Sequence, residues 1–143
     1  MTVRAILSEK GFEVVTLSPD VSVNDAVAAL AKYRIGALVV TDGHGVIKGI
    51  ISERDIVRAL AEDGPESLKR PVSNLMTANV KVCTENHTIN EVMEIMTNGR
   101  FRHLPVEREG KLAGVISIGD VVKRKIAEVQ KEAEEIRSYI ASA

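Results

Sequence analysis

An internal repeat is the strongest constraint that this sequence places on its fold. Residues 14–60 and 80–125 align with each other along their whole length. Leu38 aligns with Leu104 and Gly49 with Gly114, so one residue is lost between these positions, in a turn where a deletion does little harm. The chain therefore consists of two copies of one unit. Further identical pairs are Asn24/Asn90, Arg34/Arg100, Val40/Val106, Ser52/Ser117, Asp55/Asp120 and Val57/Val122.

The hydrophobic pattern predicts the same order of elements in each unit: strand, helix, two strands and helix. The first helix starts with the spacing of a capping box, Ser22-x-x-Asp25 in one unit and Thr88-x-x-Glu91 in the other. Glycine-containing turns between the second and third strands indicate β-hairpins. The expected strands cover residues 14–17, 37–41 and 46–51 in the first unit and residues 80–83, 104–107 and 112–117 in the second.

Other segments join or extend the units. Residues 3–7 and 72–76 are similar in sequence, and we predict that each forms a short helix leading into the unit that follows it. Residues 121–143 contain no Gly or Pro and predict one long helix with a thin apolar seam of Ile126, Val129, Ala133, Ile136 and Ile140. The predicted boundaries are residues 8–66 for repeat one, 72–128 for repeat two and 129–143 for a C-terminal helical extension.

Each unit alone has a small three-stranded core, which is marginal for a chain of roughly 60 residues. Two such units bury more apolar surface by packing together. We therefore expect an α/β (α+β) fold in which two β-α-β-β-α repeats form a pseudo-twofold disc. Such a disc has two equivalent grooves between the repeats.

The junction between the third strand and the second helix carries the same short motif in both units. It reads Gly-Ile-Ile-Ser-Glu-Arg-Asp at residues 49–55 and Gly-Val-Ile-Ser-Ile-Gly-Asp at residues 114–120. On one interpretation Ser-x-x-Asp is only a variant capping box. On the other it is a ligand site, because a helix N-terminus and a serine can hold a phosphate while the aspartate accepts from ribose hydroxyls. The glycine would then permit close approach of the ligand.

Two β-α-β-β-α units that each end in Gly, two apolar residues and Ser-x-x-Asp resemble a tandem pair of CBS (cystathionine β-synthase) domains, the Bateman module. The resemblance covers about residues 10–128 and is closest in kind to stand-alone CBS-pair proteins, with no further domain attached. It implies a non-catalytic regulatory module that requires no cofactor. The implied ligands are AMP, ADP or ATP, with NAD(H) as a further candidate, bound in the grooves to signal energy state to an unknown partner protein.

The resemblance also implies which residues contact the ligand. Because repeat one has Gly36-Ala37 where repeat two has the basic pair Arg102-His103, we expect the Asp120 site to follow the family pattern more closely than the Asp55 site. Arg54 and Lys81 are the candidates for replacing the missing basic pair. The implied residues are Asp120 and Asp55 for ribose; Ser117, Ser52, Arg102, His103, Arg54 and Lys81 for phosphate; and Phe12, Ile35, Gly36, Val115 and Ile116 for adenine.

Composition argues against several other classes. The chain has 19 basic and 20 acidic residues and only 3% aromatics, which disfavours nucleic-acid binding. A single cysteine, Cys83, excludes an internal disulfide and a cysteine-cluster metal site, and the three histidines lack metal-ligand spacing. No apolar run reaches the roughly 18 residues of a membrane span. We expect a cytoplasmic protein with no catalytic residues and no metal.

Two questions of association stay open. Small residues on the first helix of repeat one (Ala26, Ala28, Ala29 and Ala31) suit close helix approach, and we expect a homodimer of two discs that meet on such faces. The alternatives to nucleotide sensing are a protein-interaction scaffold that has no nucleotide ligand and a weak nucleotide-processing enzyme.

Overall fold

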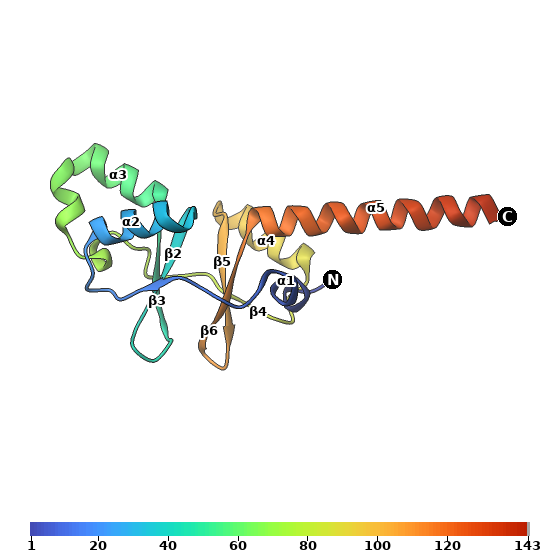
Figure 1. The fold of residues 1–143 in the computed structure, drawn as a ribbon, viewed down its shortest axis with the longest axis horizontal. Helices are drawn as coiled ribbons and strands as arrows, with labels where there is room; N and C mark the ends of the chain where they lie inside the picture. The colour runs from blue at the N-terminus through green and yellow to red at the C-terminus, as the bar shows by residue number, and fades with distance from the viewer. Residues whose placement is uncertain (143) are drawn as a thin grey trace.

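Two three-stranded sheets, one from each repeat, form the centre of the molecule (Figure 1). The computed structural model describes residues 1–142. In each sheet the first strand pairs in parallel with the second, and the second forms an antiparallel hairpin with the third. The strands are β1 (Thr16–Leu17), β2 (Ala37–Thr41), β3 (Ile47–Ser52), β4 (Cys83–Thr84), β5 (His103–Arg108) and β6 (Lys111–Ser117).

Helices begin where the sequence places caps. Thr88 and Glu91 form a complete capping box, whereas Ser22 only accepts a hydrogen bond from the backbone N–H of Asp25. The α-helices are α1 (Val3–Lys10), α2 (Val23–Tyr33), α3 (Glu53–Asp63), α4 (Ile89–Gly99) and α5 (Ile118–Ser142), and two 3₁₀ helices, η1 (Pro65–Lys69) and η2 (Val72–Asn74), join the repeats. Among the described residues, no helix is both long and apolar enough to cross a membrane.

The two hairpins are equivalent in register, which confirms the predicted repeat. Leu38 lies opposite Ile51 in one sheet, and Leu104 lies opposite Ile116 in the other. Each hairpin also has its irregularity directly after the equivalent valine, Val40 or Val106. The fold class and the order of elements are therefore as predicted. The first strands are shorter than expected, because β1 and β4 pair over only two residues each.

The short helices that lead into each repeat pack on the other repeat. Val3, Ile6 and Leu7 of α1 are buried in the core of repeat two, while Val72 of η2 is buried in the core of repeat one. The predicted short helices are therefore present, but each one contributes its apolar side chains to the core of the other repeat, which the sequence did not indicate. Isolated β-bridges fix both helices in these places. Thr2 pairs with Thr88 just before α4, and Pro71 pairs with Ser22 just before α2.

Candidate functional site

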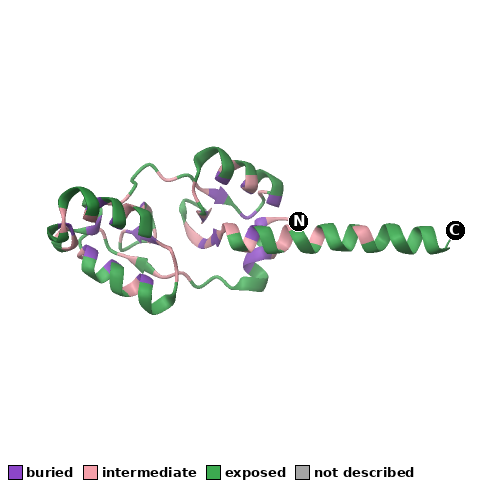
Figure 2. Ribbon diagram, turned by 90° about the horizontal axis from the view of Figure 1, so that it is seen from above, coloured by how far each residue is buried: buried purple, intermediate pink, exposed green. Residues whose placement is uncertain are grey.

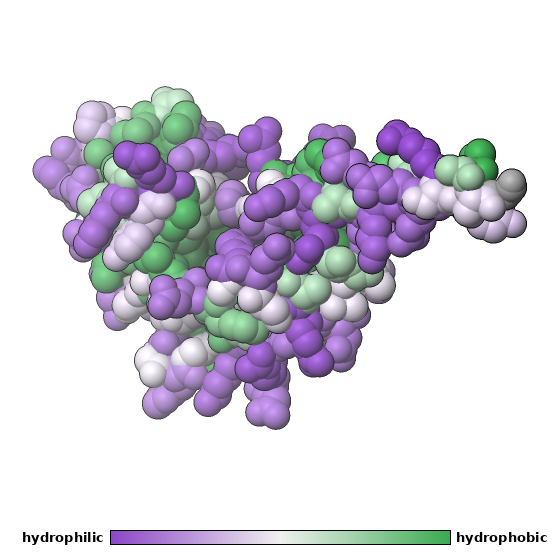
Figure 3. All heavy atoms as spheres, turned by 45° about the vertical axis from the view of Figure 1, so that its right-hand side comes forward, coloured by the Kyte–Doolittle hydropathy of each residue, from purple (hydrophilic) through white to green (hydrophobic). Residues whose placement is uncertain are grey.

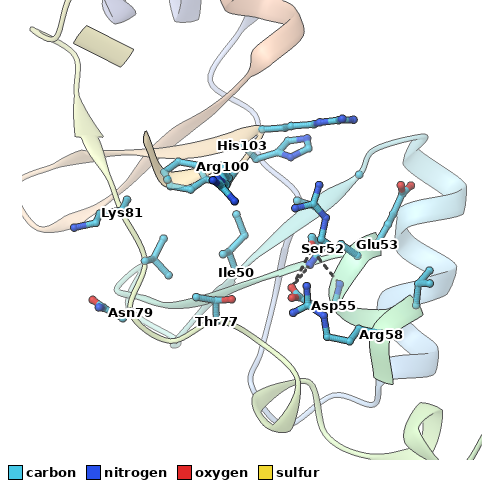
Figure 4. A pocket seen from close by; sticks show the side chains of 18 residues that line it. Ile50, Ser52, Glu53, Asp55, Arg58, Thr77, Asn79, Lys81, Arg100 and His103 are labelled. Atoms are coloured by element: carbon cyan, nitrogen blue, oxygen red, sulfur yellow. Dashed lines mark hydrogen bonds between the residues drawn. The ribbon is translucent and has the colours of Figure 1, made fainter. Parts of the chain in front are cut away.

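A groove of about 790 Å³ lies between the repeats on the side of Asp55 (Figure 4). Repeat one supplies β3 and the first turn of α3. Repeat two supplies the extended segment 77–81 before β4 and the residues around the start of β5. The groove is therefore formed only when both repeats are in place. Its lining residues that matter below are Gly36, Ile50, Ser52, Glu53, Arg54, Asp55, Arg58, Thr77, Asn79, Lys81, Arg100, Phe101, Arg102 and His103.

The Ser52-x-x-Asp55 pair occupies the N-terminus of α3 at one side of this groove. The backbone N–H of Asp55 donates to the Ser52 hydroxyl at 3.3 Å, and the backbone N–H of Ser52 donates to Oδ2 of Asp55 at 2.9 Å. The Ser52 hydroxyl also donates to Oδ2, at 3.0 Å. The pair is thus a capping box, and these bonds fix the carboxylate while they leave its Oδ1 to a ligand.

Cationic side chains outnumber carboxylates along the groove. Five cationic residues line it, against two carboxylates, Glu53 and Asp55. Figure 4 shows Arg100 and His103 of repeat two on the opposite side of the groove from Ser52. Arg100 is held there as the left-handed residue that ends α4, with φ of 57° and its backbone N–H bonded to the Met96 carbonyl. A basic groove facing a helix N-terminus is suited to an anionic ligand. The cationic residues are Arg54, Arg58, Lys81, Arg100 and Arg102.

His103 lies close to both Ser-x-x-Asp sites. Burial, then Lys10 and to a smaller degree Arg102, lower the pKa of its imidazole below the ordinary value, against the raising effect of Glu53 and Asp120. The imidazole is therefore neutral at pH 7. It also packs against Gly36, where a Cβ atom would lie 3.3 Å from Cε1 of His103.

The Asp120 site has the same cap and a different neighbour. Ser117 and Asp120 exchange the same two backbone bonds, at 2.8 and 3.2 Å. However, Nζ of Lys10 donates to Oδ2 of Asp120 at 2.7 Å and to the Val115 carbonyl at 2.9 Å. Burial opposes ionisation of Asp120, but the bonds from Lys10 and Ser117 outweigh it and hold the pKa of this carboxyl below its ordinary value.

The two sites differ because helix α1 continues three residues past its contact with the glycine of the motif, whereas helix η2 ends before the equivalent contact. Gly49 packs against Met76 and Gly114 against Leu7, so these contacts are equivalent in the two repeats. After Met76 the chain is extended, and Thr77 exchanges backbone hydrogen bonds with Ile50. After Leu7 the helix continues to Lys10, and the lysine side chain reaches the strand instead.

The structure brings most of the predicted site residues together, but in the groove of Asp55. Ser52, Arg54, Lys81 and Gly36 line this groove. Arg102 and His103, expected on the Asp120 side, line it too. The beginning of β5 faces across the molecule toward the other repeat, which the alignment of the repeats did not reveal.

Several predicted adenine-pocket residues lie elsewhere. Ile116 is fully buried in the core of repeat two, because it pairs with Leu104 on the inner face of the hairpin, so its assignment to the pocket is wrong. Ile35 packs on the core of repeat one. Phe12 is half-exposed beneath the guanidinium group of Arg108. Val115 lies on the Asp120 side, where its carbonyl accepts from Lys10.

Sequence reasoning missed five important residues, one of which is the cationic Arg58 of α3. Arg100 and Phe101 line the groove, as do Thr77 and Asn79 of the linking segment. Arg100 carried a signal, because it is identical to Arg34 in the repeat alignment. The ring of Phe101 packs directly over Gly99, where a Cβ atom would clash with it. This places an aromatic face beside the basic residues.

The family model of the CBS domain matches residues 3–62 and 72–127, so the chain belongs to the CBS-domain family. The fold agrees: the CBS-domain protein ATU1752 of Agrobacterium tumefaciens is 54% identical, with a TM-score of 0.85 over 87% of this chain and 99% of that one. Two neighbours, each 25% identical, were solved with ligands. The CBS pair of MJ0100 holds 5′-methylthioadenosine and S-adenosylmethionine (TM-score 0.77; 90% and 98% covered), and CBSX2 holds AMP (TM-score 0.70; 80% and 89% covered).

Proposed function

We propose that this chain is a non-catalytic regulatory module that binds one adenine nucleotide in the Asp55 groove. The observation that carries this proposal is the position of the Ser52–Asp55 cap. It fixes a carboxylate, with one oxygen free, at a helix N-terminus that opens into a groove lined by five cationic side chains. A carboxylate suits the hydroxyls of a ribose, and the helix N-terminus with the basic residues suits phosphate.

Two observations favour an adenine nucleotide as the ligand: the ligands of the neighbours and the charge of the groove. The ligands of the two liganded neighbours share an adenosine group, which supports recognition of that group here. The excess of cationic residues favours a phosphorylated form, so AMP, ADP and ATP come before S-adenosyl compounds, with NAD(H) as a further candidate. Phe101 offers a ring for stacking of the base.

Regulation requires more than binding. The ligand must favour one of two conformations, and a partner protein must distinguish them. The groove is built from both repeats. A nucleotide that contacts Asp55 of repeat one and the basic residues of repeat two would therefore make the relative position of the repeats depend on whether the groove is occupied. We propose that an as yet unidentified partner responds to this position.

The deciding experiment measures nucleotide affinity in the intact chain by calorimetry, across AMP, ADP, ATP, NAD(H) and S-adenosylmethionine. The Asp55→Asn variant should lose roughly 50-fold in affinity, since a hydrogen bond to a charged group contributes about 1.5–3 kcal/mol. The matched control is Glu91→Gln, which changes the equivalent carboxylate of a complete capping box at an exposed position outside the groove. Its affinity should be that of the wild type.

Two results would overturn the proposal. The first is wild-type affinity in Asp55→Asn. The second is the absence of heat of binding and of a thermal shift for every nucleotide, since a ligand of the folded state must raise the melting temperature. The second result would favour the scaffold function, in which both motifs serve only as helix caps. Release of a hydrolysed product from ATP would instead favour an enzyme.

A further inference from the structure

The long helix α5 leaves the body of the protein after its first turns and extends away from both sheets (Figures 1 and 2). Of its 25 residues only Val121 is buried. A helix that projects alone into water lacks the main source of its stability, because most helical stability in proteins comes from packing of an apolar face. The projecting half of α5 has no such packing within the chain that the structure describes.

This helix nevertheless carries an apolar face along its whole length. Figure 3 shows apolar side chains at the surface of the projecting helix, set among hydrophilic ones. Ile126 and Val129 are each 53% exposed, Ile136 is 61% exposed and Ile140 is 67% exposed. Large apolar side chains in one continuous row on a projecting helix indicate a surface that is covered in solution.

The spacing of this row is that of a coiled coil. Val122, Ile126, Val129, Ala133, Ile136 and Ile140 follow one another at alternating steps of four and three residues. Such steps place Ile126, Ala133 and Ile140 at heptad position a and the other three at position d. We call these six residues the α5 seam. A seam with a strict a/d repeat fits another helix better than it fits a flat or globular surface.

The charges beside the seam select the partner and its direction. Glu132 falls at position g and Arg137 at the following position e, which face each other across a parallel, in-register pair of identical helices. Two copies of α5 in parallel would therefore form this ion pair twice. In an antiparallel pair that uses the whole seam, Glu132 would face Glu132 of the other copy and Lys123 would face Arg137. Both contacts would be repulsive because each joins like charges.

We propose that α5 pairs with α5 of a second copy of this chain as a parallel two-stranded coiled coil through the α5 seam. The interface differs from the contact between the helical faces of two discs that the sequence suggested. It joins the two nucleotide modules at one end and leaves the grooves between their repeats open. The inference does not depend on the proposed nucleotide binding.

Sedimentation equilibrium of the full chain over a concentration series is the first test. We expect a species of twice the 15.5 kDa chain mass. The Ile136→Glu variant should dimerise at least about tenfold more weakly, because it would bury a charge in the seam. The control Ser138→Glu adds the same charge on the opposite side of the helix and should dimerise as the wild type does. A monomeric wild type, a trimer, or a dimer unaffected by Ile136→Glu would each overturn the proposal.

The parallel orientation of the two α5 helices is tested by charge reversal and by crosslinking. Glu132→Arg and Arg137→Glu should each weaken the dimer, and the double variant should restore it, which a merely structural role would not do. Ala133→Cys should form a disulfide between copies under mild oxidation, because equivalent a positions meet only in a parallel, in-register pair. Cys83 does not interfere, since burial raises the pKa of its thiol to about 12. Failure of rescue or of crosslinking would overturn the parallel arrangement.

Discussion

The two Ser-x-x-Asp sites share a sequence motif, a capping geometry and a place in the repeat, yet only one faces the groove described above. At Asp55 the neighbouring chain is extended and leaves the carboxylate facing a basic groove. At Asp120 the neighbouring chain is helical and delivers the Lys10 ammonium group to the carboxylate. The comparison teaches that the motif itself is a helix cap. The segment that packs beside the cap decides whether the cap can also bind a ligand. This segment is residues 77–81 at Asp55 and α1 at Asp120.

Removal of the Lys10 side chain should have the largest effect on the difference in nucleotide binding between the two sites. The wild-type chain should bind one nucleotide, and the Lys10→Ala variant should bind two, because the Asp120 carboxylate loses its internal partner. Calorimetric stoichiometry and equilibrium dialysis measure the difference. Lys32→Ala, an exposed lysine beside Tyr33, is the control and should still bind one. A wild-type stoichiometry of two would contradict this prediction, because it would mean that the ligand displaces Lys10 from Asp120.

Adding a methyl group at the equivalent glycines should separate stability from binding. A Cβ atom at Gly49 would lie 2.9 Å from the Thr77 carbonyl oxygen, whereas one at Gly114 would lie 2.8 Å from Cδ2 of Leu7. Both Gly49→Ala and Gly114→Ala should lower the free energy of unfolding by about 1–3 kcal/mol in denaturant titrations. Only Gly49→Ala should also weaken nucleotide binding, because it displaces the segment that borders the groove. Equal affinities in the two variants would contradict this.

The Asp120 carboxyl should make stability depend on pH in a predictable direction. Its pKa in the folded state lies below the ordinary value of 3.8, so its contribution is present above pH 4 and is lost as the pH falls through the folded-state pKa. Asp120→Asn should therefore cost about 1 kcal/mol of unfolding free energy at pH 6, as for a lost cap. The difference from the wild type should shrink toward pH 3 in urea titrations. A constant difference would assign the effect to packing.

The smallest expected effect concerns His103. Its pKa lies below the ordinary 6.5 in the free protein, and a bound phosphate would raise it, so protonation and binding should support each other. Nucleotide affinity should therefore rise a few-fold between pH 7.5 and pH 5.5, relative to the His103→Gln variant. The variant corrects for protonation of the phosphate itself. Parallel pH profiles for both proteins would exclude a phosphate contact from His103.

The fold was largely predictable because its signals are local. Helix caps such as Thr88–Glu91 and the glycine turns of the hairpins act over a few residues, and the repeat gave each of them twice. Ile116 was also within reach of prediction: strand residues alternate between faces, so Val115 and Ile116 cannot both face a ligand. The sequence thus contained the correction to that assignment.

The site was less predictable because its decisive contacts join distant parts of the chain. Lys10 and Asp120 are 110 residues apart, and nothing local marks them as partners. The same holds for Arg102 and His103. The repeat alignment assigns them to the Asp120 motif of their own repeat, but the packing of the two sheets places them in the groove of Asp55. Internal symmetry predicts equivalent positions, not the neighbours that break their equivalence.

The burial of α1 in repeat two has a consequence for protein synthesis. Val3, Ile6 and Leu7 leave the ribosome before either repeat does, but the core that receives them includes Ile116 and Val121. At roughly 5–20 residues per second these side chains wait on the order of ten seconds for their partners. Repeat one completes its own core once Val72 has emerged. Helix α1 is therefore synthesised before both repeats but enclosed last, because the core of repeat two closes only when α1 meets β6 and the first turn of α5.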